Sequence, residues 1–135
     1  MEIKDKLNEY LSKDHGFNEL LHFQIDEAKK GYVEGHFDLS GELLNIHGGV
    51  HGGALYSVAD LAGGLAVLTN DCDCTTVSGT FNYMRPAMNT DYVKVTATEL
   101  RHGGHIAVSE VRLFDDKDKL LDEGTFNYFI LEIPD

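Results

Sequence analysis

The segment from Ala54 to Leu68 is apolar on almost every side of a helix. Leu55, Val58, Ala62 and Leu65 recur at helical spacing, and further apolar positions widen this stripe. A helix with so few polar side chains has to be buried, because little of its surface can face water. The strands of the chain must therefore form a sheet that curves around it.

Strand-like segments follow this helix to the end of the chain. They are rich in Val, Thr, Phe and Tyr, are separated by clusters of turn-forming residues, and cover residues 75–84, 91–101, 105–114 and 120–133. We therefore predict one α+β domain over residues 1–135, with a curved antiparallel sheet wrapped around a long central helix.

The part of the chain before the helix is expected to add a short helix and a hairpin. A helical repeat of apolar residues stops at Gly16; its members are Ile3, Leu7, Tyr10 and Leu11. Residues 22–25 and 32–37 alternate as strands do, and they flank a Lys-Lys-Gly turn at 29–31. The hairpin would extend the same sheet.

Charge and cysteine content exclude several classes of protein. The chain has 11 Lys and Arg against 23 Asp and Glu, a net charge of −12, and such a surface repels phosphate backbones, so we expect no nucleic-acid partner. No apolar run approaches the roughly 20 residues that span a bilayer, and the first residues do not resemble a secretory signal. Cys72 and Cys74 are too close for an unstrained disulfide, which favours a cytoplasmic protein.

The glycines at the start of the central helix can present backbone donors to a ligand. Gly52 and Gly53 lie at or just before the first turn, where N–H groups have no partner within the helix. The positive end of the helix dipole also favours negative charge there. These are the properties of an oxyanion hole, in which fixed donors stabilise charge that develops during the reaction.

Asp60 lies further along the helix on a face of small or polar side chains, which we expect to include Gly53, Tyr56, Ser57, Gly63 and Gly64. Its carboxylate is costly to bury without a partner, which suggests a function. Eight residues, or about 12 Å of helix, separate Asp60 from Gly52, too far for both to act on one carbonyl group. We therefore expect a homodimer in which each site takes Gly52 from one subunit and Asp60 from the other.

The spacing of these residues resembles a known family. Asn45, then His51-Gly52-Gly53 six residues later, then Asp60 nine residues after the histidine, is similar to the signature of hotdog-fold acyl-CoA thioesterases of the phenylacetate-pathway and 4-hydroxybenzoyl-CoA type. The run from Phe81 to Ala87 resembles the strand of that family that ends in Tyr-x-x-Pro-Ala.

The resemblance implies a hotdog fold and the hydrolysis of acyl-CoA without a metal or redox cofactor. It assigns the Gly52 N–H to the thioester carbonyl, and Asp60 to attack on that carbonyl or to activation of water. It implies that Asn45 and His51 position the loop and the thioester, and that Thr76 orients the water. It further implies substrate contacts from Gly53, Tyr83, Arg85 and His105, and a dimer that pairs into a homotetramer.

Two other classes of function fit the residues. A hotdog protein can bind acyl-thioesters without cleaving them or act as a dehydratase, for which His51 and Asp60 could serve. The histidines and cysteines could instead hold zinc; these are His47, His51, His102, His105, Cys72 and Cys74. Cys-x-Cys is a tight spacing for zinc, so we expect no metal site. The sequence leaves open the acyl group and the choice between CoA and an acyl-carrier protein.

Overall fold

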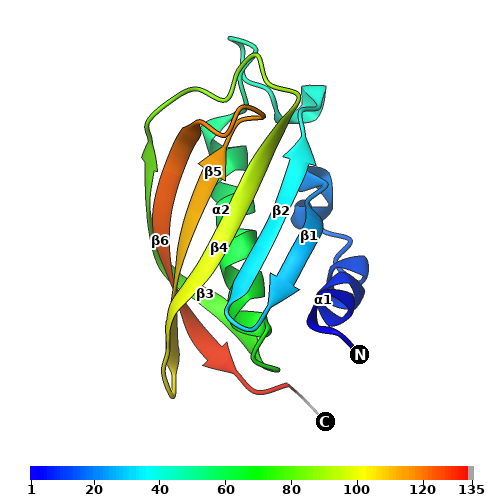
Figure 1. The fold of residues 1–135 in the computed structure, drawn as a ribbon, viewed down its shortest axis with the longest axis vertical. Coiled ribbons are helices and arrows are strands. Elements are labelled where there is room, and N and C mark those ends of the chain that lie inside the picture. Colours follow the sequence, from blue (N-terminus) through cyan, green and yellow to red (C-terminus); the bar gives the residue numbers. More distant parts are fainter. Residues whose placement is uncertain (134–135) are drawn as a thin grey trace.

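A six-stranded antiparallel sheet curves around one long helix, α2 (Gly52–Leu68), in the computed structural model, which describes residues 1–133 (Figure 1). The strands are β1 (Gln24–Lys29), β2 (Tyr32–Asp38), β3 (Asp73–Tyr83), β4 (Tyr92–His102), β5 (Ile106–Phe114) and β6 (Leu120–Leu131). The remaining helices are α1 (Ile3–Ser12) and the short 3₁₀ helices η1 (Phe17–Leu21) and η2 (Gly41–Leu43).

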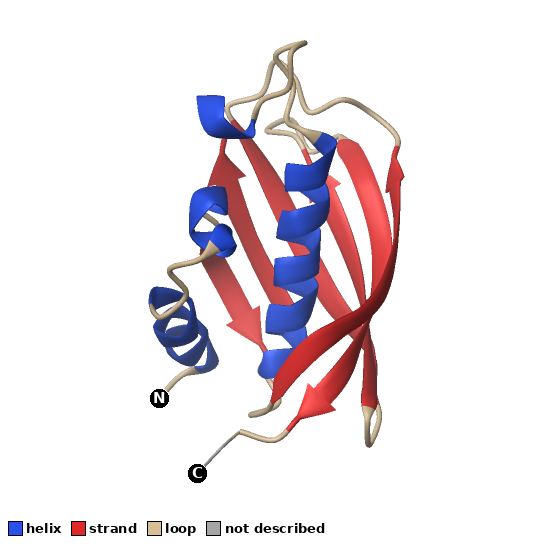
Figure 2. Cartoon of the chain, turned by 180° about the vertical axis from the view of Figure 1, so that it is seen from behind, coloured by secondary structure: helices blue, strands red, loops and turns tan. Residues whose placement is uncertain are grey.

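Helix α2 lies across the concave side of the sheet, as Figure 2 shows from behind. Its buried face packs on inward-pointing strand residues and consists of Ala54, Leu55, Val58, Ala59, Ala62, Gly63, Leu65, Ala66 and Val67. The opposite face stays partly open and consists of Gly53, Ser57, Asp60, Leu61, Gly64 and Leu68, which we call the open stripe of α2. The open stripe leaves one side of this apolar helix available to a ligand or a partner.

The strand order is β1-β2-β4-β5-β6-β3. Strand β3 follows α2 in the chain but pairs with β6, the last strand, so it forms one edge of the sheet. At the other edge, β1 lies beside α1. Among residues 1–133, no strand pairs with the outer side of β3, which leaves its backbone groups free to pair with another chain.

The predicted elements agree with the structure except in two places. Residues 17–21 form the 3₁₀ helix η1, and His22 is left-handed (φ 53°), so the predicted strand at 22–25 begins only at Gln24. The expectation that Tyr56 and Gly63 lie on the open face of the helix was also wrong, since the Tyr56 ring packs against Phe81 and Phe126 of the sheet. A Cβ atom on Gly63 would collide with the hydroxyl of Tyr128, so this glycine allows the sheet, not a partner, to approach α2.

No helix among the residues that the structure describes is both long and apolar enough to cross a membrane.

Candidate active site

The loop before α2 is held by the side chain of Asn45. Its Oδ1 accepts hydrogen bonds from the backbone N–H groups of His47 (2.9 Å) and Gly49 (3.2 Å). The backbone N–H of Asn45 also donates to the Gly49 carbonyl at 2.7 Å. Gly48 completes this tight turn with φ +84°, a conformation that a side chain would strain. Asn45 thus fixes the loop that leads to His51.

His51 caps α2 and selects which backbone donor stays free. Its Nδ1 accepts from the Gly53 N–H at 2.8 Å, so one of the unpaired donors of the first turn is used. The Tyr83 hydroxyl donates to the Gly52 carbonyl at 2.7 Å, so the 52–53 peptide is held at both ends. Within residues 1–133, the Gly52 N–H has no acceptor. The free donor is therefore the one predicted for the oxyanion.

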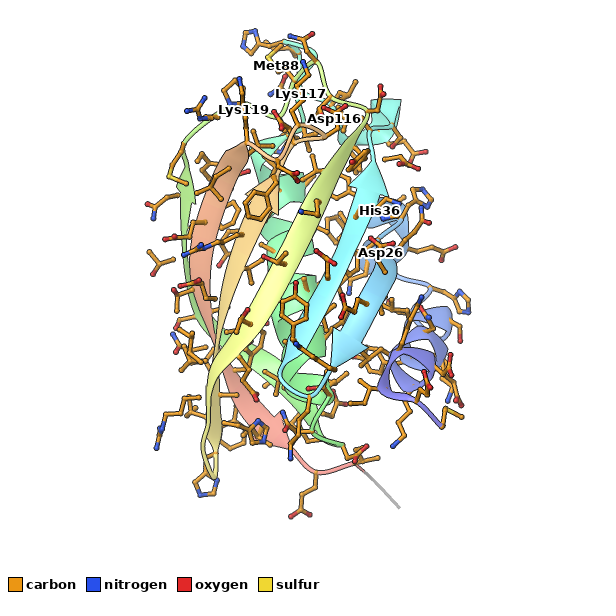
Figure 3. All side chains as sticks on the ribbon, in the orientation of Figure 1. Asp26, His36, Met88, Asp116, Lys117 and Lys119 are labelled. Carbon is orange, nitrogen blue, oxygen red and sulfur yellow. The ribbon has the colours of Figure 1, made fainter. Side chains whose placement is uncertain are left out.

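A cavity of about 490 Å³ opens beside this free N–H. Its walls come from the loop before α2, the first turns of α2 and the segment after β3; they include Asn45, Gly52, Leu55, Tyr83, Arg85 and Met88. Figure 3 shows Met88 at the same end of the molecule as Lys117 and Lys119 of the β5–β6 turn. We call this space the glycine-loop cavity.

Asp60 lies on the open stripe of α2, two turns beyond Gly52, and β3 and β6 supply its polar neighbours. Thr76 of β3 donates its hydroxyl hydrogen to Asp60 Oδ1 at 2.8 Å. The register of β3 against β6 shifts between Thr76 and Ser78, which leaves Val77 as the extra residue of a bulge. Bulges redirect side chains at the edges of sheets, and this one follows the residue that holds Asp60.

Tyr128 of β6 connects the same part of the helix to the sheet. Its hydroxyl donates to the Asp60 backbone carbonyl at 2.8 Å, and its side chain is almost fully buried. This contact depends on Gly63, which leaves space for the hydroxyl. No local pattern indicates this role, because Tyr128 lies 68 positions from Asp60 and has the pattern of an ordinary core tyrosine.

Burial raises the pKa of the Asp60 carboxyl above its ordinary value, and the hydroxyl groups of Thr76 and Tyr128 act in the opposite direction. A carboxylate with a raised pKa is a stronger base than an exposed one, and one that accepts few hydrogen bonds remains available to react. The Asp60 environment thus suits attack on a carbonyl group or activation of water.

A smaller cavity of about 120 Å³ lies over Asp60. It is lined in part by residues that the sequence did not single out for the site, Tyr10, Asn18, Cys74 and Tyr128. Burial is the largest cause that raises the pKa of the Cys74 thiol to about 12, so this thiol is protonated at neutral pH and is a poor nucleophile.

Gly52 and Asp60 line different cavities of the same chain. Their separation along α2, about 12 Å, is the one expected from the sequence. Most of the other predicted site residues line one of three cavities. Asn45, Tyr83 and Arg85 line the cavity with Gly52, and Thr76 lines the cavity with Asp60. His51 and Gly53 line a third hollow of about 340 Å³, between η1 and the start of α2.

His105 is the predicted site residue that lies apart from the others. It is in the turn between β4 and β5, at the end of the sheet opposite to the loop before α2 (Figure 1). Its ring stacks on Phe129 with centroids 6.2 Å apart. The structure thus does not bring His105 to Gly52 or Asp60 of its own subunit.

The histidines and cysteines do not form a metal centre in the part of the chain that the structure describes. No group of three or more His, Cys, Asp or Glu side chains there converges as metal ligands would. His102 instead pairs with the largely buried Glu99 side chain at 2.7 Å.

Comparison with known proteins gives a consistent picture. The family model described as "Thioesterase superfamily" matches residues 47–121, more than half of the chain. A relative in Archaeoglobus fulgidus, named "Putative esterase", is 27% identical over 120 residues, which cover 89% of this chain and 78% of that protein.

Solved structures show the same fold at low sequence identity. The PaaI protein of the Escherichia coli phenylacetic acid degradation operon superposes with a TM-score of 0.86, at 19% identity, over 98% of this chain and 94% of that one. A Streptococcus mutans protein bound to acetyl CoA gives a TM-score of 0.82, at 20% identity, over 91% and 99% of the two chains. The predicted hotdog fold is thereby confirmed.

Proposed function

The chain belongs to the thioesterase superfamily, and from this premise we propose that it hydrolyses an acyl-CoA thioester to a carboxylic acid and free CoA. One observation carries the proposal. Helix α2 bears an unused N–H donor at Gly52 and, on its open stripe, a carboxylate at Asp60 that a threonine hydroxyl holds in place. A thioester needs both groups, a donor for its carbonyl oxygen and a base or nucleophile for its carbonyl carbon.

The reaction follows from these two groups. The Gly52 N–H hydrogen-bonds the carbonyl oxygen and stabilises the negative charge that forms when the carbon is attacked. Asp60 either attacks that carbon, to form an anhydride that water then hydrolyses, or takes a proton from a water molecule that attacks. In both routes the carbon–sulfur bond breaks, the thiolate of CoA leaves and takes up a proton, and the acyl group ends as a carboxylic acid.

We propose that two subunits share each site. Two features of the chain support a dimer, the free outer edge of β3 and the open stripe of α2. A two-fold axis can place two such helices antiparallel, so that the Gly52 end of one lies toward Asp60 of its partner. This arrangement removes the separation of about 12 Å within one chain.

Basic residues near the glycine-loop cavity suit the phosphate groups of CoA. Arg85 lines the cavity, and Lys117 and Lys119 lie at the same end of the molecule (Figure 3). Arg85 is thus the cation placed to pair with a phosphate group of the substrate, whereas the two lysines share their turn with Asp115, Asp116 and Asp118. The Streptococcus mutans protein bound to acetyl CoA supports this choice of carrier.

The test of this function is thiol release, followed with a thiol-reactive dye, across aryl, short-chain and medium-chain acyl-CoAs. We expect turnover with at least one class, and the ranking identifies the acyl group. The absence of thiol from every acyl-CoA, with a folded protein, would contradict the proposal. Binding without release would point to an acyl-thioester binding protein, and an enoyl product without thiol to a dehydratase.

Mixing two inactive variants tests the shared site. Asp60→Ala protomers keep Gly52, and Gly52→Pro protomers keep Asp60, so a mixed dimer regains one complete site if the two groups come from different subunits. After unfolding and refolding together in equal amounts, half of the dimers are mixed, and we expect about a quarter of the wild-type rate. A mixture as inactive as its components would show that the site lies within one subunit.

A further inference from the structure

A carboxyl group without any partner lies inside the sheet, near the glycine-loop cavity. Asp122 of β6 is 0% exposed, and neither of its side-chain oxygens has a hydrogen-bond partner among the described residues. Buried carboxyl groups are normally paired, because an isolated ionised carboxylate is costly to bury. Nothing in the proposed hydrolysis uses this group.

Tyr83 is the neighbour that links Asp122 to the site. The two residues are directly opposite in the antiparallel pairing of β3 and β6, so their side chains share the concave face with Cβ atoms about 5 Å apart. The Tyr83 hydroxyl, however, donates to the Gly52 carbonyl at 2.7 Å. The hydroxyl that holds the peptide after Gly52 therefore belongs to the residue directly opposite the unpartnered carboxyl.

No charged side chain compensates for Asp122. Burial is the cause that raises the pKa of its carboxyl to about 7, with no contribution from a charged neighbour. The residue opposite it on β5 is Leu113, and its neighbour on the same face of β6 is Gly124. The titratable groups on elements packed against this part of β6 include Tyr83 of β3, Tyr56 of α2, whose ring packs on Phe126, and Arg85, whose backbone N–H donates to the Leu121 carbonyl. Of these, Tyr83 has its own pKa raised by burial and then by the charge of Asp122.

We propose that Asp122 and Tyr83 form a proton-linked positioning pair for the oxyanion donor. While Asp122 is protonated, the Tyr83 hydroxyl stays on the Gly52 carbonyl and holds the start of α2, with the Gly52 N–H directed into the glycine-loop cavity. When Asp122 loses its proton, the carboxylate takes the hydrogen bond of the Tyr83 hydroxyl, because it has no hydrogen-bond partner of its own among the described residues. The Gly52–Gly53 peptide then keeps only its bond to His51, and the donor is no longer fixed.

The sign of the effect follows from this exchange. The protonated state of Asp122 is the active one, so hydrolysis should decline as pH rises through the pKa of Asp122. Asp60 gives the opposite limb, because its carboxylate must be ionised to react. This inference rests on the proposed hydrolysis only for its effect on rate, since the exchange of the hydrogen bond takes place without substrate.

The test is an NMR titration of the ligand-free protein with labelled Asp carboxyl and Tyr ζ carbons. The Asp122→Asn and Tyr83→Phe variants assign the two signals. We expect Asp122 to titrate far above an ordinary carboxyl, and the Tyr83 signal to shift with the same midpoint in wild type but not in Asp122→Asn. In Tyr83→Phe the Asp122 midpoint should move to higher pH, because the carboxylate loses its donor. Titration of Asp122 in the ordinary acid range, or a Tyr83 signal that does not follow it, would overturn the proposal.

Kinetics with the same proteins add a second readout. The alkaline decline of kcat should disappear in Asp122→Asn and in Tyr83→Phe, whereas a purely structural role for Asp122 would lower the rate equally at all pH values. A decline that persists in both variants would also overturn the proposal. If no thioester is hydrolysed, the proposed function fails while the NMR titration still decides whether the pair exists.

Discussion

Asp60→Asn should lower kcat for thioester hydrolysis by about 10³-fold or more while the protein keeps its fold and oligomeric state. The amide has nearly the size of the carboxylate, and its oxygen can still accept the hydrogen bond that Thr76 now donates to Asp60 at 2.8 Å. It can neither attack the carbonyl carbon nor take a proton from water. The measurements are kcat by thiol release, thermal unfolding and size-exclusion chromatography.

A matched control is Asp26→Asn, which removes a charge from the outer face of the sheet, where Asp26 pairs with His36 (Figure 3). This variant should keep wild-type activity. If Asp60→Asn retained most of the wild-type rate, Asp60 could be neither nucleophile nor general base. In wild type, burial raises the pKa of Asp60. As pH is lowered, kcat should therefore begin to fall at a higher pH than it would with an exposed aspartate.

The same raised pKa predicts the effect of Asp60 on stability. A carboxyl whose pKa is higher in the folded protein than in the unfolded chain favours folding when protonated, so its ionised form costs stability as pH rises above the unfolded value. Asp60→Asn removes that cost. At neutral pH the variant should therefore unfold at a temperature no lower than wild type, whereas a structural carboxylate would leave it less stable.

Gly52→Pro should reduce kcat by about 10²–10³-fold, the usual cost of losing one oxyanion donor. Proline removes the Gly52 N–H and keeps the start of the helix, because Gly52 is the first residue of α2, where proline is well tolerated; its ring adds a contact with Tyr83. The residue before proline must be extended, and His51 already has φ −57° and ψ 134°. The substitution thus removes the proposed donor without disturbing the helix.

Gly52→Ala is the control that keeps the N–H. Its Cβ would lie 3.4–3.6 Å from the Tyr83 ring, an ordinary to slightly close contact, so we expect only a small change in kcat. The difference in kcat between the two variants therefore measures the contribution of the Gly52 N–H. Equal activities of the proline and alanine proteins, both folded by circular dichroism, would show that the Gly52 N–H does not bind the oxyanion.

The sequence predicted most clearly what depends on local spacing. The apolar repeat of α2 gave the central helix within two residues of its start at Gly52. The offset between Gly52 and Asp60 predicted that they do not share one cavity within a chain. Helical geometry is regular enough for such arithmetic, which is why both expectations agree with the structure.

Contacts between distant strands could not be predicted in this way. That Tyr128 reaches Asp60 and that Asp122 lies opposite Tyr83 both depend on the pairing of β3 with β6, which no local pattern encodes. Asp122 even contradicts the expected alternation of apolar residues inside and polar residues outside, because it points inward from β6 together with Gly124 and Phe126. The strand predicted at 22–25 began too early for a similar reason, since η1 covers the end of the core with Leu21 and the chain turns at His22 before β1.

The pairing of β3 with β6 also determines when the site can form during synthesis. The strand that carries Thr76 is made soon after α2, yet its partner β6 is made after all the other strands described here. Contacts so far apart in sequence form late and slowly. Until β6 is in place, β3 has no neighbour in the sheet, Asp60 lacks its hydroxyl partners, and the edge that a second subunit would use does not exist. We therefore expect a nascent chain to acquire the proposed site and the free β3 edge together, once β6 has joined the sheet.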